Sequence, residues 1–378
     1  MDKLQGNLSI LHIILAIRET STPYNEHCLP WADRRDIAIC TYFRSDIDHP
    51  GTLTLFEGNG SLTGFFRILQ AALDAKEYDI IHAHSPHVGF LFLAGTLFSG
   101  RKFVPPTVIT VHDSYPNYKL RNRLMFIPIF ASFQGVICCS RASYNSFPAL
   151  YKRLTGKRLG IVQNGLNIDR IDRMTLSICR PYQTSDFTIV AISRLVDIKN
   201  PFSVIAAFQQ STDQASQTGR LVYIGDGPLR QSLITRSGEV GPQTRIEFTG
   251  LIPREEVFEY LLNADLFISM SRGEGLPISV LEAMACRCPV LLSDIPPHRE
   301  IAEGVDFIPL IQSDDVAGFA REIRKFREMP VSERTAIGQK CRELVEERFS
   351  LTAMHAGYEK IYAQIIDKPV SSHLETIR

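Results

Sequence analysis

The chain has 378 residues, 44% of them hydrophobic, which is enough for two ordinary domains that each bury a core. Lysine and arginine total 41, as do aspartate and glutamate, so the formal net charge is zero. This balance excludes a protein that binds nucleic acid through bulk positive charge, and it requires any anion site to be local.

The eight cysteines form no C-x-x-C pair and lie in apolar runs, a pattern typical of reduced, buried thiols that favours a cytoplasmic location. Cys286 and Cys288 lack the partners of a zinc site and are expected to be core thiols. The early apolar run Ile10–Ile17 contains His12 and is followed by no cleavage site, so it predicts a buried strand rather than a signal sequence. No apolar run approaches the roughly 18 residues needed to cross a bilayer.

Short β-branched runs alternate with helical patterns along the first half of the chain, which predicts an α/β fold with a parallel sheet. A covering helix is expected over Ser61–Lys76. The expected strands lie near Ile10–Ile17, Asp36–Phe43, Asp79–His84, Thr107–Val111 and Gly135–Cys139.

A second α/β series follows a polar, irregular stretch around Arg173–Asp186, so we expect two domains, 1–175 and 176–378. A last helix, about 351–366, is a candidate to pack back on the N-terminal domain. The expected strands are Phe187–Ile192, Arg220–Gly225, Arg245–Phe248, Leu266–Ser269 and Pro289–Leu292, and long charged helices are expected at about Asp314–Glu328 and Ser332–Glu347.

The most informative segment runs from Glu274 to Glu282 and places two carboxylates across a loop that turns into a helix. Pro277 suits the first helical position, so Glu274 is expected in the loop and Glu282 about one turn inside. The N–H groups around Gly275, Leu276 and the helix start, with the positive end of the helix dipole, suit a phosphate. The segment therefore predicts a nucleotide-sugar site, in which one carboxylate binds sugar hydroxyls and the other a ribose.

Several motifs in the second half, in this order and spacing, resemble family 4 glycosyltransferases of the GT-B fold. They are Arg194 with Lys199, Tyr223–Pro228, Phe248–Gly250, the Glu274–Ala285 segment and Pro289-Val290. The first half carries weaker matches at Asp79–His84, Thr110–Asp113, Cys139-Ser140 and Gln163–Gly165. The resemblance implies two Rossmann-like domains whose parallel sheets face each other across an interdomain cleft, with the nucleotide sugar on the C-terminal domain and the acceptor on the N-terminal one.

The resemblance also implies roles for individual residues of the second half. Arg194 and Lys199 would hold the donor diphosphate, Glu274 would contact the donor sugar and Glu282 the ribose. The donor site would further include Gly225, Gly250, Leu251, Ile252, Gly275, Leu276 and Pro277. An alternative is that Arg194 and Lys199 are solvated loop charges. A dinucleotide site at Gly225-Asp226-Gly227 is disfavoured, because Arg230 stands where the third glycine of that motif is needed.

In the first half, His112 ends a buried strand, where side chains of an open α/β sheet meet ligand. A histidine at a strand end is often only structural, but the resemblance implies a place near the transferred sugar. His84 and Ser85 are expected on the acceptor side. Family members usually carry a Gly-Gly turn after the first strand; here Thr20, Ser21 and Thr22 would supply hydroxyls in its place.

Asp46-Ile47-Asp48 mimics the metal-binding D-x-D pattern of the other large glycosyltransferase fold, but it precedes Pro50-Gly51 and is better interpreted as a solvated turn. No metal and no cofactor are therefore expected, the substrate being a UDP- or GDP-sugar. A second departure from the family is Arg287, which stands where a glycine commonly follows the helix, so a left-handed cap there would be strained.

Basic residues flank the apolar run Leu124–Phe130, a pattern that suits docking on anionic lipid at the inner face of a membrane. A buried helix with a solvated basic edge is the favoured interpretation. The basic residues are Lys119, Arg121, Arg123, Lys152, Arg153, Lys157 and Arg158.

The sequence as a whole predicts a glycosyltransferase that moves a sugar from a nucleoside diphosphate to a hydroxyl acceptor in glycan, polysaccharide or glycolipid biosynthesis. The family resemblance implies that the anomeric configuration is retained. The acceptor would be a glycan, a lipid-linked glycan or a polyol. Two alternatives remain open: a nucleotide-sugar epimerase or hydrolase of the same fold, and a catalytically silent nucleotide-sugar-binding protein.

Overall fold

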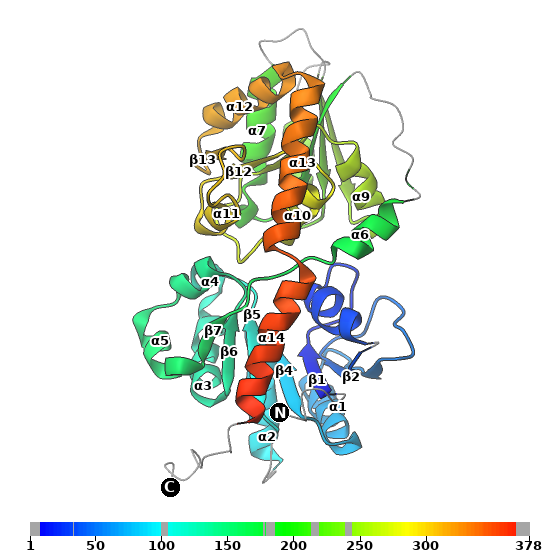
Figure 1. Ribbon diagram of the computed structural model, residues 1–378, viewed down its shortest axis with the longest axis vertical. Helices are drawn as coiled ribbons and strands as arrows, with labels where there is room; N and C mark the ends of the chain where they lie inside the picture. The colour runs from blue at the N-terminus through cyan, green and yellow to red at the C-terminus, as the bar shows by residue number, and fades with distance from the viewer. Residues whose placement is uncertain are drawn as a thin grey trace. The chain divides into compact units, whose positions relative to one another are not determined.

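The chain divides into two compact units, each built around one parallel sheet (Figure 1). The first unit runs to Asn164 and resumes at Thr352, and the second is Gly165–Leu351. The computed structural model describes residues 8–32, 34–99, 105–176, 178, 186–212, 219–238 and 244–367. The division falls before the expected residue 175, because helix α6 (Ile168–Thr175) packs against helices of the second unit. Most of the expected linker lies outside the described residues.

The first sheet has seven parallel strands in the order β3-β2-β1-β4-β5-β6-β7. All five strands expected in this half are present, because each is an apolar run that is covered on both faces. Two short edge strands, β3 and β7, were not predicted. The strands are β1 (Ser9–Ile14), β2 (Asp36–Thr41), β3 (Thr54–Phe56), β4 (Ile80–Ala83), β5 (Thr107–Val111), β6 (Gly135–Cys138) and β7 (Leu159–Ile161).

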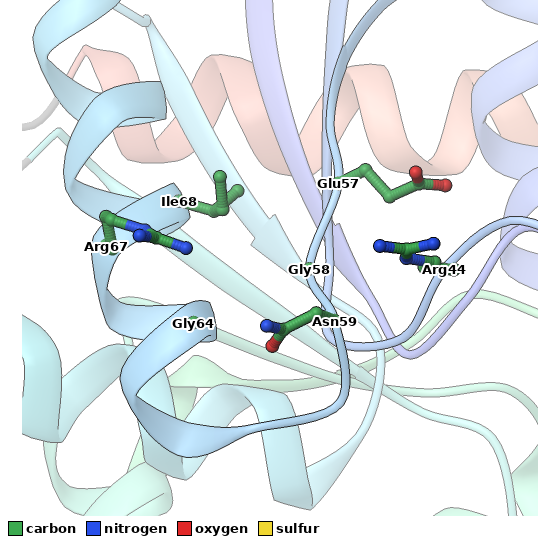
Figure 2. Close-up of a pocket in the computed structure, with 7 residues that line it drawn as sticks. All are labelled: Arg44, Glu57, Gly58, Asn59, Gly64, Arg67 and Ile68. Carbon is green, nitrogen blue, oxygen red and sulfur yellow. The ribbon is translucent and has the colours of Figure 1, made fainter.

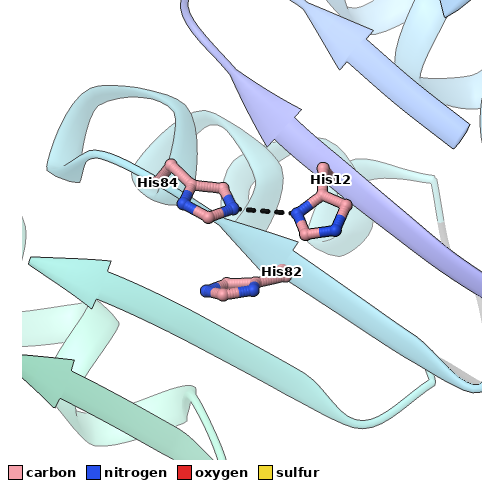
Figure 3. A group of neighbouring side chains, drawn as sticks. All are labelled: His12, His82 and His84. Carbon is pink, nitrogen blue, oxygen red and sulfur yellow. Dashed lines mark hydrogen bonds between the residues drawn. The ribbon is translucent and has the colours of Figure 1, made fainter. Parts of the chain in front are cut away.

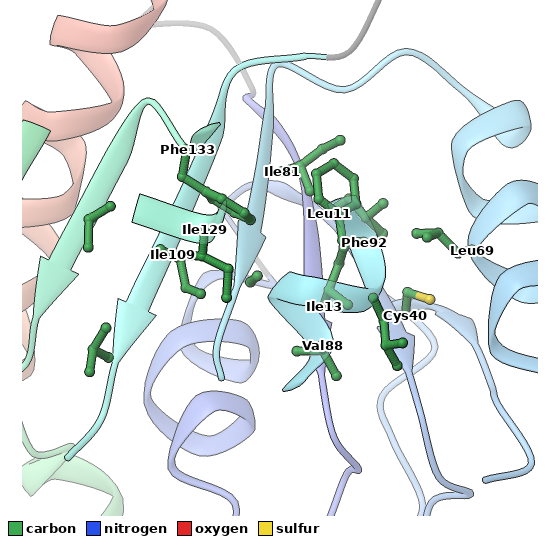
Figure 4. Packing of buried hydrophobic residues seen from close by; sticks show 14 of the residues in the cluster. Leu11, Ile13, Cys40, Leu69, Ile81, Val88, Phe92, Ile109, Ile129 and Phe133 are labelled. Atoms are coloured by element: carbon green, nitrogen blue, oxygen red, sulfur yellow. The ribbon is translucent and has the colours of Figure 1, made fainter. Parts of the chain in front are cut away.

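Helices α1 (Leu62–Ala75), α2 (Pro86–Phe98) and α3 (Leu120–Ser132) cover one face of this sheet. Because strand side chains alternate between faces, Leu11 and Ile13 of β1 point to this side and pack in one apolar core with the helices (Figure 4). Ser61 caps α1 by accepting a hydrogen bond from the Gly64 N–H at 3.0 Å, as expected for a helix that begins at this point.

The other face of the first sheet carries polar side chains beneath the C-terminal helix α14 (Leu351–Ile366). His82 bonds the Tyr362 hydroxyl through Nδ1 at 2.7 Å and the Thr110 hydroxyl through Nε2 at 2.7 Å. The Tyr358 hydroxyl lies 2.8 Å from Thr110 Oγ1. All of these side chains are buried. The last helix is thus joined to the sheet of the first unit by a buried hydrogen-bonded network.

The second sheet has six parallel strands in the order β10-β9-β8-β11-β12-β13. All five expected strands are present, and only the two-residue edge strand β13 was not predicted. The strands are β8 (Phe187–Ile192), β9 (Gly219–Ile224), β10 (Thr244–Gly250), β11 (Leu266–Ser269), β12 (Val290–Ser293) and β13 (Leu310–Ile311). The helices are α6, α7 (Pro201–Thr212), α8 (Arg230–Ser237), α9 (Arg254–Leu262), α10 (Ile278–Ala285), α11 (Pro296–Ile301), α12 (Val316–Glu328) and α13 (Val331–Arg348).

Both sheets reverse their winding direction beside their first strand. In the first sheet β2 and β3 lie on one side of β1 and β4 lies on the other; in the second sheet β9 and β10 lie on one side of β8 and β11 on the other. Loops that leave the carboxyl ends of strands at such a switch point diverge and leave room for a ligand. The topology therefore directs attention to the loops after β1 and β4 and after β8 and β11.

Candidate active site

At the switch point of the second sheet, Lys199 and Glu274 form an ion pair. Lys199 follows β8 and Glu274 follows β11, so the adjacency of these strands joins residues that lie 75 positions apart. Lys199 Nζ donates to Glu274 Oε2 at 2.5 Å, and the two side chains are only 15% and 10% exposed. A buried cation and carboxylate at a ligand-binding edge form a polar pair that can contact phosphate and hydroxyl groups.

A turn in the left-handed conformation directs Lys199 toward the sheet edge. Asn200 has φ 53°, which asparagine tolerates better than most residues. Its amide nitrogen donates to the Ser313 carbonyl at 2.8 Å, and its amide oxygen accepts from the Ser203 hydroxyl. Pro201 then begins α7, as its fixed φ favours. The turn between β8 and α7 is therefore held at both ends.

Arg194, the other expected phosphate ligand, lies in the same loop between β8 and Lys199. Its side chain is exposed and forms no ion pair with any described residue. The neighbouring backbone is closely packed: a Cβ at Gly225 would lie 2.1 Å from the Ser193 carbonyl oxygen, and one at Gly227 would lie 2.5 Å from the Leu195 oxygen. Glycine is therefore needed at both positions because the loop after β9 packs closely against the loop after β8, not because the segment is a dinucleotide motif.

Glu282 has a partner that the sequence did not predict. It is buried in α10, and both of its oxygens accept hydrogen bonds from the guanidinium of Arg254, the first residue of α9. The Arg254 guanidinium also lies 5.0 Å from the centre of the Phe258 ring. The forked pair fixes the orientation of the Glu282 carboxylate. No spacing rule connects residues 28 positions apart on two helices, so only the tertiary structure reveals this contact.

His298 is a second group that the sequence analysis missed. It is fully buried on α11, with Nδ1 2.9 Å from the Ser293 carbonyl oxygen, and its Nε2 has no hydrogen-bond partner in the described parts of the chain. Burial lowers the pKa of His298 to about 4, although the nearby Glu274 carboxylate opposes this shift. The ring is therefore neutral at pH 7. Its place just after β12, at the carboxyl edge of the sheet, is the signal that could have identified it.

The loop that contains the expected donor-site residues Leu251 and Ile252 begins at Gly250, whose φ is 73°. The Gly225 N–H donates to the Gly250 carbonyl at 2.9 Å, which ties this loop to the one after β9. Leu251 is 75% exposed, an unusual position for a large apolar side chain, and Ile252 is half-buried. The loop thus offers backbone groups and one exposed apolar side chain at the sheet edge.

Helix α10 begins at Ile278, and Pro277 precedes it as the N-cap rather than the first helical residue that was expected. Gly275 and Leu276 are both buried in the loop that precedes the helix. The prediction for the other end is confirmed: Arg287 adopts the left-handed conformation with φ 58°. Its guanidinium donates to Gln339 on α13 at 3.1 Å. Cys286 and Cys288 are buried and free, as expected for core thiols.

The switch point of the first sheet carries a chain of histidines. Figure 3 shows His12 of β1 and His82 and His84 at the end of β4, with His12 and His84 pointing toward each other. His12 Nδ1 lies 2.9 Å from His84 Nε2, and His84 Nδ1 lies 3.3 Å from His112 Nε2. His27 lies edge-on to both His84 and His112, with ring centroids 4.8 and 5.6 Å away. The predicted site residues His84 and His112 therefore lie beside His12 and His27, which were not predicted as site residues.

Burial controls the charge of this histidine cluster. It lowers the pKa of His112 to about 4 and those of His27 and His84 well below their usual value, with neighbouring histidines adding to the effect for the latter two. The rings are therefore neutral at pH 7. His112 Nδ1 and His27 Nε2 are buried without a hydrogen-bond partner among the described residues. Such atoms are available to a ligand.

The remaining residues expected on the acceptor side lie in two local motifs. Ser85 caps α2 by accepting from the Val88 N–H at 3.4 Å, so its hydroxyl has a structural task. In the loop after β1, Ser21 Oγ accepts from the Tyr24 N–H at 3.4 Å, Thr20 is exposed and Thr22 is half-buried. This loop leads directly into a single π-helical turn, η2 (Pro23–Cys28), which positions His27.

A surface pocket of the first unit lies beside the start of α1. Figure 2 shows Arg67 of α1 and Arg44 of the loop after β2 on opposite sides of it, with Asn59 between them. Glu57, which also lines the pocket, accepts a hydrogen bond from the Ser45 N–H at 2.6 Å. Both arginines are exposed, so the pocket is a polar surface depression with two cations at its rim.

The acidic D-x-D pattern lies in an exposed turn, and Asp46 pairs with Arg18 at 2.9 Å. Helix α3 buries Phe126 and Phe130 but exposes Leu120, Leu124 and Ile127 by 70%, 56% and 44%. One face of α3 is thus apolar and open to solvent. Among the described residues, no helix combines the length and apolar character needed to span a bilayer.

Comparisons with known proteins agree with the two-unit fold. The family model described as "Glycosyltransferase Family 4" matches residues 31–170, and the model described as "Glycosyl transferases group 1" matches residues 181–344. The putative glycosyltransferase EpsD of Bacillus subtilis is 26% identical over 320 residues, covering 80% of this chain and 81% of EpsD. The N-acetyl-alpha-D-glucosaminyl L-malate synthase of Bacillus anthracis is 26% identical, covering 77% of this chain and 76% of that one.

Among solved structures, Anabaena HepE in complex with UDP and glucose aligns with a TM-score of 0.70 and 18% identity, over 95% of this chain and all of HepE. A UDP-forming trehalose-phosphate synthase from Burkholderia xenovorans aligns with a TM-score of 0.77 and 14% identity, over 96% of this chain and all of that one. These likenesses establish the GT-B fold. With the two family matches, one on each half, they identify the chain as a glycosyltransferase of family 4.

Proposed function

We propose that this glycosyltransferase uses a nucleoside-diphosphate sugar and transfers the sugar with retention of configuration. The observation that carries the proposal is the ion pair of Lys199 with Glu274 at the switch point of the second sheet. An ammonium beside a carboxylate suits a donor in which a phosphate and a hydroxylated sugar are adjacent. Glu282, held by Arg254, is assigned to the ribose.

In this proposal the chain stabilises the leaving nucleotide with charge. Arg194 has no carboxylate partner among the described residues and offers a fork of donors, while Lys199 offers a compact charge. Both would offset the negative charge that grows on the diphosphate as the glycosidic bond breaks. The departing phosphate takes the proton of the acceptor hydroxyl, which attacks from the same face. No metal is assigned to the diphosphate.

His112 is assigned to a hydroxyl of the transferred sugar. Its Nδ1 is buried and lacks a partner within the described chain, and its ring is neutral, so it is suited to hydrogen bonding rather than ion pairing. The acceptor is assigned to the first unit, near His84 and the hydroxyls of Thr20, Ser21 and Thr22. Ser85 is assigned there as well, although its hydroxyl caps α2.

We infer UDP rather than GDP as the first nucleotide to test, since HepE is described in complex with UDP and glucose. Acceptors in polysaccharide or glycolipid synthesis are supported by the names of relatives. These include a putative teichuronic acid biosynthesis glycosyltransferase of Bacillus subtilis and an alpha-monoglucosyldiacylglycerol synthase of Streptococcus pneumoniae, which match 57% and 60% of this chain.

The test is a thermal-shift panel of nucleoside diphosphates and their sugars, because a ligand at 100 times its dissociation constant stabilises by about 2.7 kcal/mol. The stabilising donor is then incubated with candidate acceptors, and NMR of the product gives the anomeric configuration. An inverted product would refute retention. Conversion or hydrolysis of the donor without an acceptor would favour the epimerase or hydrolase alternative, and donor binding without turnover on any acceptor would favour the silent binding protein.

A peripheral membrane contact through α3 is a further part of the proposal. Its open apolar face, formed by Leu120, Leu124 and Ile127, is flanked by exposed basic residues. The exposed residues are Lys119, Arg121, Arg153 and Lys157, whereas Arg123 and Arg158 donate to backbone carbonyls and serve the fold. Each basic residue near an anionic surface contributes about 1 kcal/mol. In a sedimentation assay with acidic vesicles at low salt, the wild type should be found with the vesicles and Leu124→Glu should stay in the supernatant. Equal sedimentation of both proteins would contradict the contact.

A further inference from the structure

The histidine cluster of the first unit contains two groups of three whose ring nitrogens lie within 4.8 Å of one another. One group is His12, His82 and His84, and the other is His27, His84 and His112. They differ in how their nitrogens are occupied. Both nitrogens of His82 are hydrogen-bonded to hydroxyls at 2.7 Å, so the first group is committed to the fold.

The second group has nitrogens available. His27 Nε2 is buried and without a hydrogen-bond partner in the described structure, and the contact between His84 Nδ1 and His112 Nε2 is long at 3.3 Å. For comparison, His12 Nδ1 and His84 Nε2 are 2.9 Å apart, the usual length of such a bond. The His84–His112 separation is thus poor for a hydrogen bond between neutral rings.

The same separation suits a shared metal ion. Two nitrogens bound to one tetrahedral ion at about 2.0–2.1 Å lie roughly 3.3 Å apart. His27 approaches both rings edge-on, with centroids 4.8 Å from His84 and 5.6 Å from His112, and one nitrogen of each of the three rings lies within 4.8 Å of the other two. Burial keeps all three rings neutral, which leaves a lone pair on each for a metal.

Neighbouring residues hold the rings of His84 and His27 in place. His84 Nε2, the ring nitrogen that does not face His112, lies 2.9 Å from His12 Nδ1. When Nε2–H donates to His12, Nδ1 keeps its lone pair for a metal, and such an outer partner fixes the orientation of a ligating ring. His27 is held on a π-helical turn that begins with Pro23. His27 lies on η2, whereas His84 follows β4 and His112 follows β5, so the three rings come from three separate segments of the first unit.

We propose that His27, His84 and His112 form a binding site for a divalent transition-metal ion such as Zn²⁺ or Co²⁺, with the fourth position open to water. Imidazole nitrogen suits these ions, and three protein ligands with one open position is a stable arrangement for zinc. The site is not assigned to the donor diphosphate, so turnover without metal remains expected. Where the proposed role of His112 holds, metal on Nε2 places the ring proton on Nδ1, so Nδ1 can no longer accept a hydrogen bond from a sugar hydroxyl, and transfer is inhibited.

The test is titration of the purified, full-length protein with Co²⁺, followed by visible absorption. One Co²⁺ per chain with the intense absorption of tetrahedral cobalt is the expected result, and Zn²⁺ should displace it. His27→Gln should weaken binding by at least the roughly 10–100-fold that loss of an outer partner causes. His49→Gln, the same change at an exposed loop histidine, is the matched control and should bind as the wild type.

X-ray absorption of the wild-type cobalt complex counts imidazole ligands without any variant, and it keeps the test decisive if His27→Gln fails to fold. Three nitrogens at about 2.0–2.1 Å are expected. A six-coordinate spectrum, no binding, or equal binding by a folded His27→Gln would overturn the proposal. None of these readouts requires glycosyl transfer, so failure of the proposed reaction and failure of the metal site are distinguishable. Inhibition by Zn²⁺ that EDTA reverses, and that His27→Gln loses, tests the link to His112.

Discussion

The two sheets wind in the same way, yet the side chains at their switch points differ in charge. In the second unit the loops after β8 and β11 carry Lys199 and Glu274 as an ion pair. In the first unit the ends of β4 and β5 carry His84 and His112, which burial keeps neutral. Charged groups suit a diphosphate, and neutral imidazoles suit sugar hydroxyls or a metal. The comparison indicates that one topology serves two kinds of recognition.

The largest expected effect comes from removing the cation of the second unit. Lys199→Ala should lower turnover by about 10²–10³, or roughly 2.7–4 kcal/mol, because a preorganised charge would no longer offset the leaving phosphate. Steady-state kinetics with the donor identified by thermal shift measures the change. Lys325→Ala, at an exposed position on α12, is the matched control. Unchanged turnover and donor affinity in Lys199→Ala would show that the second unit does not bind the diphosphate through this charge.

A second substitution tests whether a buried ion pair in the second unit also stabilises its fold. Arg342 on α13 is buried and donates to both oxygens of Asp172 on α6, at 2.8 and 2.7 Å. Arg342→Met should lower the free energy of unfolding by about 1.5–3 kcal/mol, since hydrogen bonds to a charged group are lost. Denaturant unfolding measures this. Lys340→Met, on the same helix, should change stability little, and equal losses would contradict the assignment.

The ion pair of Arg342 with Asp172 should also make the free energy of unfolding depend on pH. The hydrogen bond from Arg342 lowers the pKa of Asp172, so its contribution to stability is present above the ordinary aspartate pKa. That contribution is lost as pH falls through the lowered value in the folded state. The stability difference between wild type and Arg342→Met should therefore shrink in acid. A difference that stays constant from pH 7 down to below pH 3 would show that Asp172 is not the responsible carboxylate.

The neutral site should respond more weakly to substitution. His112→Asn should lower turnover by about 2- to 10-fold, because one hydrogen bond between neutral groups contributes about 0.5–1.5 kcal/mol. The effect should be insensitive to salt, in contrast to that of Lys199→Ala. Kinetics at two ionic strengths measure both. A loss as large as that of Lys199→Ala, with the same salt dependence, would mean that His112 acts through charge.

The smallest effect concerns the C-terminal end of α10, at Arg287. Arg287 is left-handed with φ 58°, and removing its Cβ relieves about 1 kcal/mol of strain. Arg287→Gly loses the bond to Gln339 but should still gain several tenths of a kcal/mol in stability. Thermal unfolding measures it. Arg287→Ala, which keeps the strain and loses the bond, should be less stable than wild type; the reverse order would refute the strain.

The sequence predicted all ten principal strands because parallel strands covered on both faces are continuous apolar runs. It missed β3, β7 and β13, since two or three residues at a sheet edge carry no period. The prediction that the Arg287 cap would be strained also needed only local pattern. The unit boundary at Asn164 was not predicted, because it depends on which helices α6 contacts.

The site was only partly predictable for a related reason. Spacing and resemblance identified Lys199 and Glu274 separately, but their contact depends on β8 lying beside β11. Arg254 and His27 were missed because their partners lie on other elements, 28 and more residues away. His12 was noticed only as an interruption of an apolar run. Its alternation with Leu11 and Ile13 could have placed it on the opposite face of the strand.

Calorimetric titration of UDP into the wild type and into Lys199→Ala tests the central claim most directly. The account predicts one saturable site per chain, affinity that falls with salt, and a clear loss of affinity in the variant, which remains folded. Binding of UDP that is unchanged in Lys199→Ala, or no binding of either UDP or GDP to the wild type, would contradict it.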